Sequence, residues 1–253
     1  MKTTTMLKAA FGLFSVALTL TASAAIQLGA TRIIYNEASN SESVSASNRS
    51  EDRPSLLQIW LDDGDIKSTP EQAVTPFHIS PPLANVGPGA KQVIRLSLVD
   101  RDSLPKDRES IFWLNVLDIP ASLQDSDPAN LLRVAVRTRI KVFYRPKSLT
   151  RSDINFSPND LSWEFRGNSK DTVNIRNSTP YHITFSGVRV AVGKKEYQQG
   201  PGSLMVPPRD ALTIPLNQWT STDSATPIQE AKVRGNLIND LGGEESFSSS
   251  IRK

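Results

Sequence analysis

The chain has 253 residues, with 29 lysine and arginine residues against 26 aspartate and glutamate residues, and it contains no cysteine. The net charge of +3 lacks the concentrated basic surplus that is typical of nucleic-acid binders. Because no disulfide can form, each domain must be stabilised by burial of a full-sized core.

The first 24 residues have the composition of an export signal. Lys2 and Lys8 supply a positive start, residues 9–21 form a short apolar run, and residues 22–24 (Ala-Ser-Ala) supply a small-residue cleavage site. The run is shorter than the roughly 20 apolar residues that a membrane-spanning helix needs. We therefore expect a cleaved signal peptide over residues 1–24 and a mature chain that starts at Ala25. Removal of the two lysines would leave 29 − 2 = 27 basic residues against 26 acidic ones, a net charge of about +1.

Strand patterns dominate the next hundred residues. Residues 92–99 alternate, with Ile94, Leu96 and Leu98 on one face, whereas residues 56–61 and 111–119 are apolar on both faces, as in central strands. Turn-forming residues separate these runs, and 17 prolines argue against long helices. The pattern predicts an antiparallel β-sandwich.

The run from residue 131 to residue 146, LLRVAVRTRIKVFYRP, is unusual in its length. Alternate side chains of a strand share a face, and the apolar row consists of Leu132, Val134, Val136, Ile140, Val142 and Tyr144. The opposite row consists of Arg133, Arg137, Arg139, Lys141 and Arg145. Sixteen extended residues at roughly 3.3 Å each would span about 50 Å, which one compact domain cannot pair and cover. We predict that part of this strand serves another domain or chain; the alternative is an ordinary core face.

A second set of strand patterns follows Pro146, which removes a backbone donor and is expected to end the long strand. Further strands are predicted over residues 172–176, 181–192, 212–216 and 232–238. The sequence therefore predicts an all-β protein with two sandwich domains, over residues 25–146 and 147–253.

Residues with catalytic or metal-binding potential are sparse. The two histidines, His78 and His182, have no further histidine or carboxylate at metal-ligand spacing. No nucleophile elbow, glycine-rich phosphate loop or pair of catalytic carboxylates is present. Residues 177–179 (Asn-Ser-Thr) match a glycosylation sequon, a pattern that arises often by chance. We expect no enzymatic activity, no metal and no cofactor.

Several short motifs in order along the chain resemble the periplasmic pilus chaperones, the PapD-like family. They are TRIIY at 31–35, PPL at 81–83, PGAK at 88–91, LPKDRES at 104–110, IKVFYRP at 140–146, NSTPY at 177–181 and INDLG at 238–242. The resemblance implies two immunoglobulin-like sandwiches set as an L. It also implies a periplasmic chaperone that binds pilus subunits and delivers them to an outer-membrane usher.

In this family the long strand completes a subunit that lacks its last strand, and this covers an edge that would otherwise aggregate. By the resemblance, Leu132, Val134 and Val136 enter the subunit groove, where each would contribute roughly 1.5–3 kcal/mol. The free chain would expose this row unless it associates with itself. The connection at residues 121–130 is short and the chain lacks cysteine, features of the short-loop branch of the family.

The resemblance also assigns roles to charged residues. Arg32 and Lys141 match the two bases that hold the terminal carboxylate of the subunit, although two solvated surface bases are the alternative. Because Lys141 lies in the row opposite Val134, strand twist or a bulge would have to aim it into the cleft. Glu109, Arg145 and Asp240 match an interdomain charge cluster, whose ion pairs, if exposed, would fix geometry more than stability.

Two other interpretations stay open, and one stretch departs from the family pattern. The chain could be a pilus subunit or adhesin, although it lacks the cysteine pair and the alternating N-terminal extension of subunits. It could also be an exported carbohydrate-binding sandwich, although Trp60, Trp113, Trp163 and Trp219 are dispersed in the sequence. Residues 37–53 are rich in serine and asparagine and predict a flexible loop.

Overall fold

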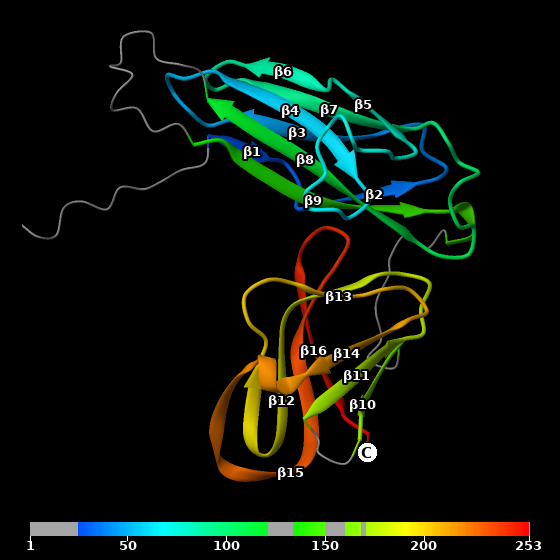
Figure 1. The fold of residues 1–253 in the computed structure, drawn as a ribbon, viewed down its shortest axis with the longest axis vertical. Coiled ribbons are helices and arrows are strands. Elements are labelled where there is room, and N and C mark those ends of the chain that lie inside the picture. The colour runs from blue at the N-terminus through cyan, green and yellow to red at the C-terminus, as the bar shows by residue number, and fades with distance from the viewer. Residues whose placement is uncertain (1–24, 121–133, 150–159, 168–170, 253) are drawn as a thin grey trace, which may run out of the picture.

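The computed structural model describes residues 25–120, 134–149, 160–167 and 171–252, which form two β-sandwiches joined end to side (Figure 1). Within these ranges the helical elements are short 3-10 turns, at Lys147–Leu149 and Leu216–Gln218 among others. The predicted all-β architecture is therefore confirmed. The predicted signal peptide lies outside the described residues.

The first sandwich packs a four-stranded sheet, in the order β1-β3-β7-β5, against a five-stranded sheet, in the order β2-β9-β8-β4-β6. All its strand pairs are antiparallel except β2 with β9, which is parallel. The strands are β1 Ile26–Leu28, β2 Arg32–Asn36, β3 Glu42–Asn48, β4 Ser55–Asp62, β5 Phe77–Ser80, β6 Leu83–Val86, β7 Lys91–Leu98, β8 Ser110–Pro120 and β9 Val136–Arg145.

The second sandwich packs a three-stranded sheet, β10-β11-β14, against a four-stranded sheet, β13-β12-β15-β16. Its strands are β10 Leu161–Phe165, β11 Thr172–Asn177, β12 Ile183–Gln198, β13 Leu204–Val206, β14 Ala211–Pro215, β15 Thr220–Ile238 and β16 Glu244–Ser250. Figure 1 shows the turn between β15 and β16 reaching towards the first sandwich.

Each sandwich has its own apolar core, built from the inward rows of its strands. In the first, Leu57 of β4, Leu114 of β8 and Val142 of β9 are fully buried. In the second, Trp163 packs edge-on against Phe185, with ring centroids 5.8 Å apart. The two cores account for the stability that the absence of cysteine demands.

Residues 37–53 do not form the flexible loop that their composition predicts, because β3 occupies Glu42–Asn48 and pairs with β7. Val44 and Ala46 point into the core, and the side-chain amide of Asn48 donates to the carbonyls of Arg53 and Val86. The small serines between them face outwards. A strand whose inward residues are this small gives a weak alternation signal.

The long strand is shorter than predicted. It begins at Val136, whereas Val134 lies before it and residues 131–133 lie outside the described residues. The reason is the partner strand: the β8–β9 ladder ends at the pair Asp118 and Val136, so Val134 and Ala135 have no paired strand among the described residues. The predicted end at Pro146 is correct, since β9 stops at Arg145.

Candidate functional site

Strand β9 has one paired edge and one that is half free. Strand β8 pairs with it from Val136 to Tyr144, but β2 pairs with it only from Lys141 to Arg145. Among the described strands none covers the second edge over residues 136–140. Backbone N–H and C=O groups on such an edge are a template for another strand.

The apolar row of β9 changes its environment along the strand. Ile140, Val142 and Tyr144 are in the core of the first sandwich, whereas Val136 is 39% exposed and Val134 is 59% exposed. Leu132 lies outside the described residues. The core interpretation therefore holds for the end near Pro146, whereas Val134 and Val136 face solvent, and use of that exposed end by another domain or chain stays a prediction.

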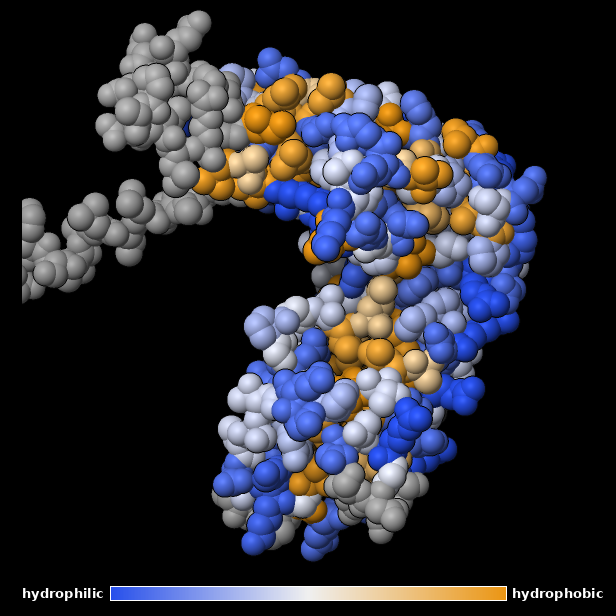
Figure 2. Space-filling view, viewed as in Figure 1, coloured by the Kyte–Doolittle hydropathy of each residue, from blue (hydrophilic) through white to orange (hydrophobic). Residues whose placement is uncertain are grey.

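Arg32 and Lys141 lie side by side at the point where the free edge ends, because β2 and β9 pair in parallel with these two residues opposite each other. Arg32 donates to the carbonyl of Ile238 at 3.2 Å, and Lys141 donates to the hydroxyl of Ser203 at 3.1 Å. Both acceptors belong to the second sandwich, so the two bases lie at the junction. Figure 2 shows the surface hollowed where the two sandwiches meet.

Neither base forms an ion pair with a carboxylate in the part of the chain that the structure describes. The Nε of Arg32 is buried without a hydrogen-bond partner. Burial and the neighbouring charge of Arg32 lower the pKa of Lys141 to about 8, and burial also lowers the pKa of Arg32. Two partly buried cations with unused donors form a site that favours an anion.

Strand twist or a bulge was expected to aim Lys141, and the β8–β9 ladder contains no bulge. The β8–β9 register runs without a shift from Ser110 opposite Tyr144 to Asp118 opposite Val136. Lys141 instead lies on the outer face of the sheet, and the second sandwich is placed against that face. Val136 and Lys141 thus lie on opposite faces of strand β9.

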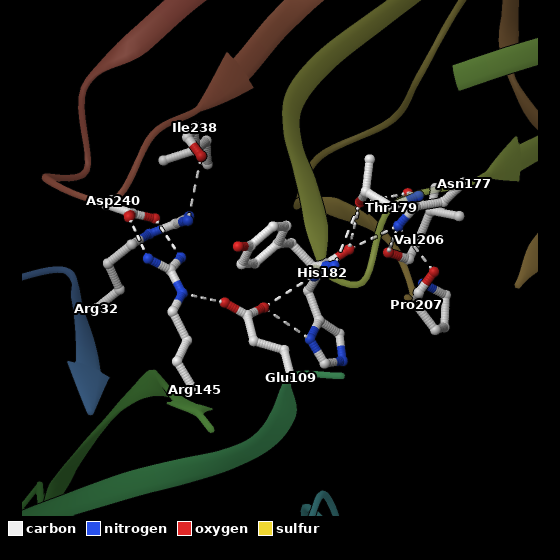
Figure 3. A network of polar contacts seen from close by, with 11 residues as sticks. Arg32, Glu109, Arg145, Asn177, Thr179, His182, Val206, Pro207, Ile238 and Asp240 are labelled. Atoms are coloured by element: carbon white, nitrogen blue, oxygen red, sulfur yellow. Dashed lines mark hydrogen bonds and ion pairs between the residues drawn. The ribbon is translucent and has the colours of Figure 1, made fainter. Parts of the chain in front are cut away.

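Glu109, Arg145 and Asp240 meet at the same junction, as Figure 3 shows. Arg145 donates from Nε to Glu109 at 2.6 Å and from both terminal nitrogens to Asp240, at 2.6 and 2.7 Å. Glu109 also accepts from the backbone N–H of His182 at 2.8 Å, and its other contact is the Nδ1 of His182 at 3.1 Å.

The ion pairs of this cluster were expected to add little stability if they were exposed. They are not exposed. Arg145 is 5% exposed and Glu109 is 3% exposed. Burial acts to lower the pKa of Arg145, but the bonds and charges of Asp240 and Glu109 outweigh it and raise that pKa. Removing one partner of a buried pair typically costs about 3–5 kcal/mol, so the cluster affects stability as well as geometry.

Some contributors to the junction were not apparent from the sequence. His182 joins Glu109, and Phe143 lies between the ring of His182, 5.5 Å away, and the guanidinium of Arg32, 5.4 Å away. Only the proximity of sequence-distant strands reveals these contacts. By contrast, Asn177 has a structural role: it is fully buried and donates to the carbonyls of Tyr181 and Pro207 (Figure 3), so its amide is not free for a glycan.

The tryptophans are less dispersed than their positions in the chain suggest. Trp60 and Trp113 lie on the adjacent strands β4 and β8, and each carries an arginine over its ring, Arg137 and Arg139 respectively. Because a guanidinium already covers each ring, they do not form an open platform for a sugar. The described residues contain no cluster of potential metal ligands, and none of their helices is long and apolar enough to cross a membrane.

Comparison with known proteins gives consistent matches over both sandwiches. The family model described as "Pili and flagellar-assembly chaperone, PapD N-terminal domain" matches residues 25–150, and "Pili assembly chaperone PapD, C-terminal domain" matches residues 157–249. The chaperone protein FimB/FhaD of Bordetella pertussis is 33% identical over 221 residues, which cover 83% of this chain and 89% of that protein.

Solved structures agree. The YadV chaperone of Escherichia coli superposes with a TM-score of 0.71 at 33% identity, covering 90% of this chain and 100% of that one. A chain from the Salmonella enterica SafA pilin in complex with the SafB chaperone has a TM-score of 0.67 at 25% identity, covering 89% of this chain and 95% of its own. The protein belongs to the PapD-like family of fimbrial chaperones.

Proposed function

We propose that the chain is a periplasmic chaperone that binds fimbrial subunits by adding strand β9 to an incomplete subunit sandwich. The observation that carries the proposal is the half-free edge of β9, which ends beside the unpaired bases Arg32 and Lys141. In this mechanism a subunit strand pairs along residues 136–140 and places its terminal carboxylate between the two bases. Leu132, Val134 and Val136 fill the groove that the subunit leaves open.

The carboxylate would act as the register mark. A one-residue slip between two strands turns every side chain to the other face, so an anchor at one end of the ladder selects the productive pairing. The buried cluster around Arg145 would hold the second sandwich at the angle that keeps Ser203 and Ile238 beside the bases. Residues 25–146 and 147–253 form the two domains in this proposal, after residues 1–24 direct export.

Delivery to an outer-membrane usher completes the proposal and is supported by kinship with fimbrial chaperones. The same kinship, together with two separate cores, favours a chaperone over a pilus subunit or a carbohydrate-binding protein. The proposed partners are thus fimbrial subunits and an usher, with no nucleic acid, no membrane insertion and no cofactor.

A defined peptide tests the central step. A nonapeptide of alternating valine and threonine, made with either a free C-terminal carboxylate or a C-terminal amide, imitates the subunit strand. The acid form should bind the wild-type chain, and Arg32→Ala and Lys141→Ala should each weaken it at least about thirtyfold, the equivalent of 2 kcal/mol for a truncated charge pair. Arg95→Ala, on the opposite sheet, is the control. Equal binding of acid and amide, or normal binding by both variants, would contradict the proposal.

A further inference from the structure

A buried polar network on the outer face of the five-stranded sheet holds the first residues of β9. We call it the Asp62 clamp; its members are Trp60, Asp62, Trp113, Asn115, Arg137 and Arg139. Asp62 accepts bonds from Arg139, through Nη2 and through Nε at 3.2 Å, and from Nη2 of Arg137 at 3.4 Å. Asn115 accepts from Arg137 at 2.6 and 2.9 Å and donates to Asp62 at 2.7 Å.

The centre of the clamp is closed against solvent. The side chain of Asp62 is 0% exposed and Asn115 is fully buried, while Arg137 and Arg139 keep 27% and 19% of their side-chain surface. Each guanidinium carbon lies 4.8 Å from the centroid of its tryptophan ring. Burial alone would raise the pKa of Asp62, but the bonds from Arg139, Asn115 and the Gly64 N–H lower it, so the carboxylate stays charged.

The clamp lies on the part of β9 that has a free edge. Arg137 and Arg139 belong to the half of the strand that β2 does not cover, next to the exposed Val136. Over this half the ladder to β8 is one-sided. In addition to the ladder, the clamp holds Arg137 and Arg139, because their side chains are bonded to β4 and β8.

We propose that Asp62 is a positioning residue, which keeps the start of β9 extended and aimed so that Val134 and Val136 meet a partner in one register. The inference rests on the proposed function, because it assigns a purpose to a fixed donor segment. A segment ordered before binding does not have to be ordered during it, so the clamp should speed capture. Asp62 itself touches no partner in this scheme.

The test in the free protein is segment-resolved amide hydrogen exchange of Asp62→Asn. The substitution is isosteric and removes the charge that both arginines share. Exchange over residues 136–139 should accelerate by about tenfold or more, while exchange over residues 140–144 stays as in the wild type. Asp62→Glu, which keeps the charge, should restore part of the protection. Asp107→Asn is the matched control, because Asp107 also pairs with two arginines but on an exposed surface.

The second measurement is the association rate of the carboxylate nonapeptide. Asp62→Asn should lower this rate by about tenfold and change the dissociation rate less, whereas Asp107→Asn should leave both unchanged. Uniform acceleration of exchange through both sandwiches would make Asp62 a purely structural residue and overturn the inference, as would unchanged exchange and association. Failure of the wild-type chain to bind the peptide would instead overturn the proposed function, and the exchange result would still decide whether Asp62 fixes β9.

Discussion

The titration of Lys141 offers a sharp test of the carboxylate anchor. Burial and the adjacent charge of Arg32 lower its pKa to about 8 in the free protein. A bound carboxylate favours the protonated amine and raises that pKa again. Binding of the acid peptide should therefore take up a proton near pH 8, and its affinity should fall as the pH rises through this value.

The expected size follows from the fraction of protonated Lys141. With a pKa of about 8, roughly nine tenths of the chains carry the charge at pH 7 and roughly one tenth at pH 9, which predicts about a tenfold loss of affinity between them. Lys141→Arg should flatten this profile, because a guanidinium stays charged throughout the range. The amide peptide should bind weakly at every pH.

Isothermal titration calorimetry in two buffers of different ionisation enthalpy would measure both the affinity and the proton uptake. A flat wild-type profile from pH 7 to pH 9, or the same slope for acid and amide peptides, would refute the reasoning. The stability of the free protein gives an independent check on the direction of the pKa shift of Lys141. Because the folded state lowers the pKa of this lysine, stability relative to Lys141→Gln should increase as the pH rises from about 8 towards the unfolded value of roughly 10.4.

Three further substitutions test the other parts of the site. Val134→Glu should change the melting temperature of the free monomer little, since Val134 is 59% exposed, yet it should abolish peptide binding. A large fall in the melting temperature would instead mean that Val134 is a core residue. Arg145→Met should lower the free energy of unfolding in urea by about 3–5 kcal/mol, because it leaves the buried Glu109 and the partly buried Asp240 without their partner; a loss below about 1 kcal/mol would contradict the buried pair of Arg145 and Glu109. Asn177→Ala should cost about 1–3 kcal/mol, measured in the same way, because the Pro207 carbonyl loses this donor and the Tyr181 carbonyl keeps the hydroxyl of Thr179; Asn174→Ala on the same strand is its control.

The sequence pattern was reliable where strands bury large side chains on one face. Ile94 and Leu96 alternate with polar residues, and β7 forms where they predict it. It failed at β3, where the inward residues are as small as Ala46 and where the amide of Asn48 donates to the nearby carbonyl of Arg53 and to that of Val86, which is distant in sequence. No single-sequence signal distinguishes such an asparagine from one in a loop.

For the site, too, the sequence supplied part of the information. The motifs contained Arg32, Lys141 and the Arg145 cluster, but the environment of each residue depends on the second sandwich. Whether Arg145 is exposed or buried follows from the approach of Asp240, ninety-five residues further along the chain. The contact between Glu109 and His182 likewise spans two domains. Local patterns can identify such residues, but burial and pKa arise only from tertiary contacts.

The two faces and the two ends of strand β9 lie in different environments. Its even-numbered residues provide core at Ile140, Val142 and Tyr144 and exposed apolar surface at Val136. Its odd-numbered residues provide the clamp at Arg137 and Arg139, the proposed anchor Lys141 and the ion pairs of Arg145 at the junction. A slip of one residue against β8 would bury four cations and expose the core row, so both rows oppose it. The free edge has a separate origin, because β2 pairs with β9 only from Lys141 to Arg145 and leaves the backbone of residues 136–140 without a second strand.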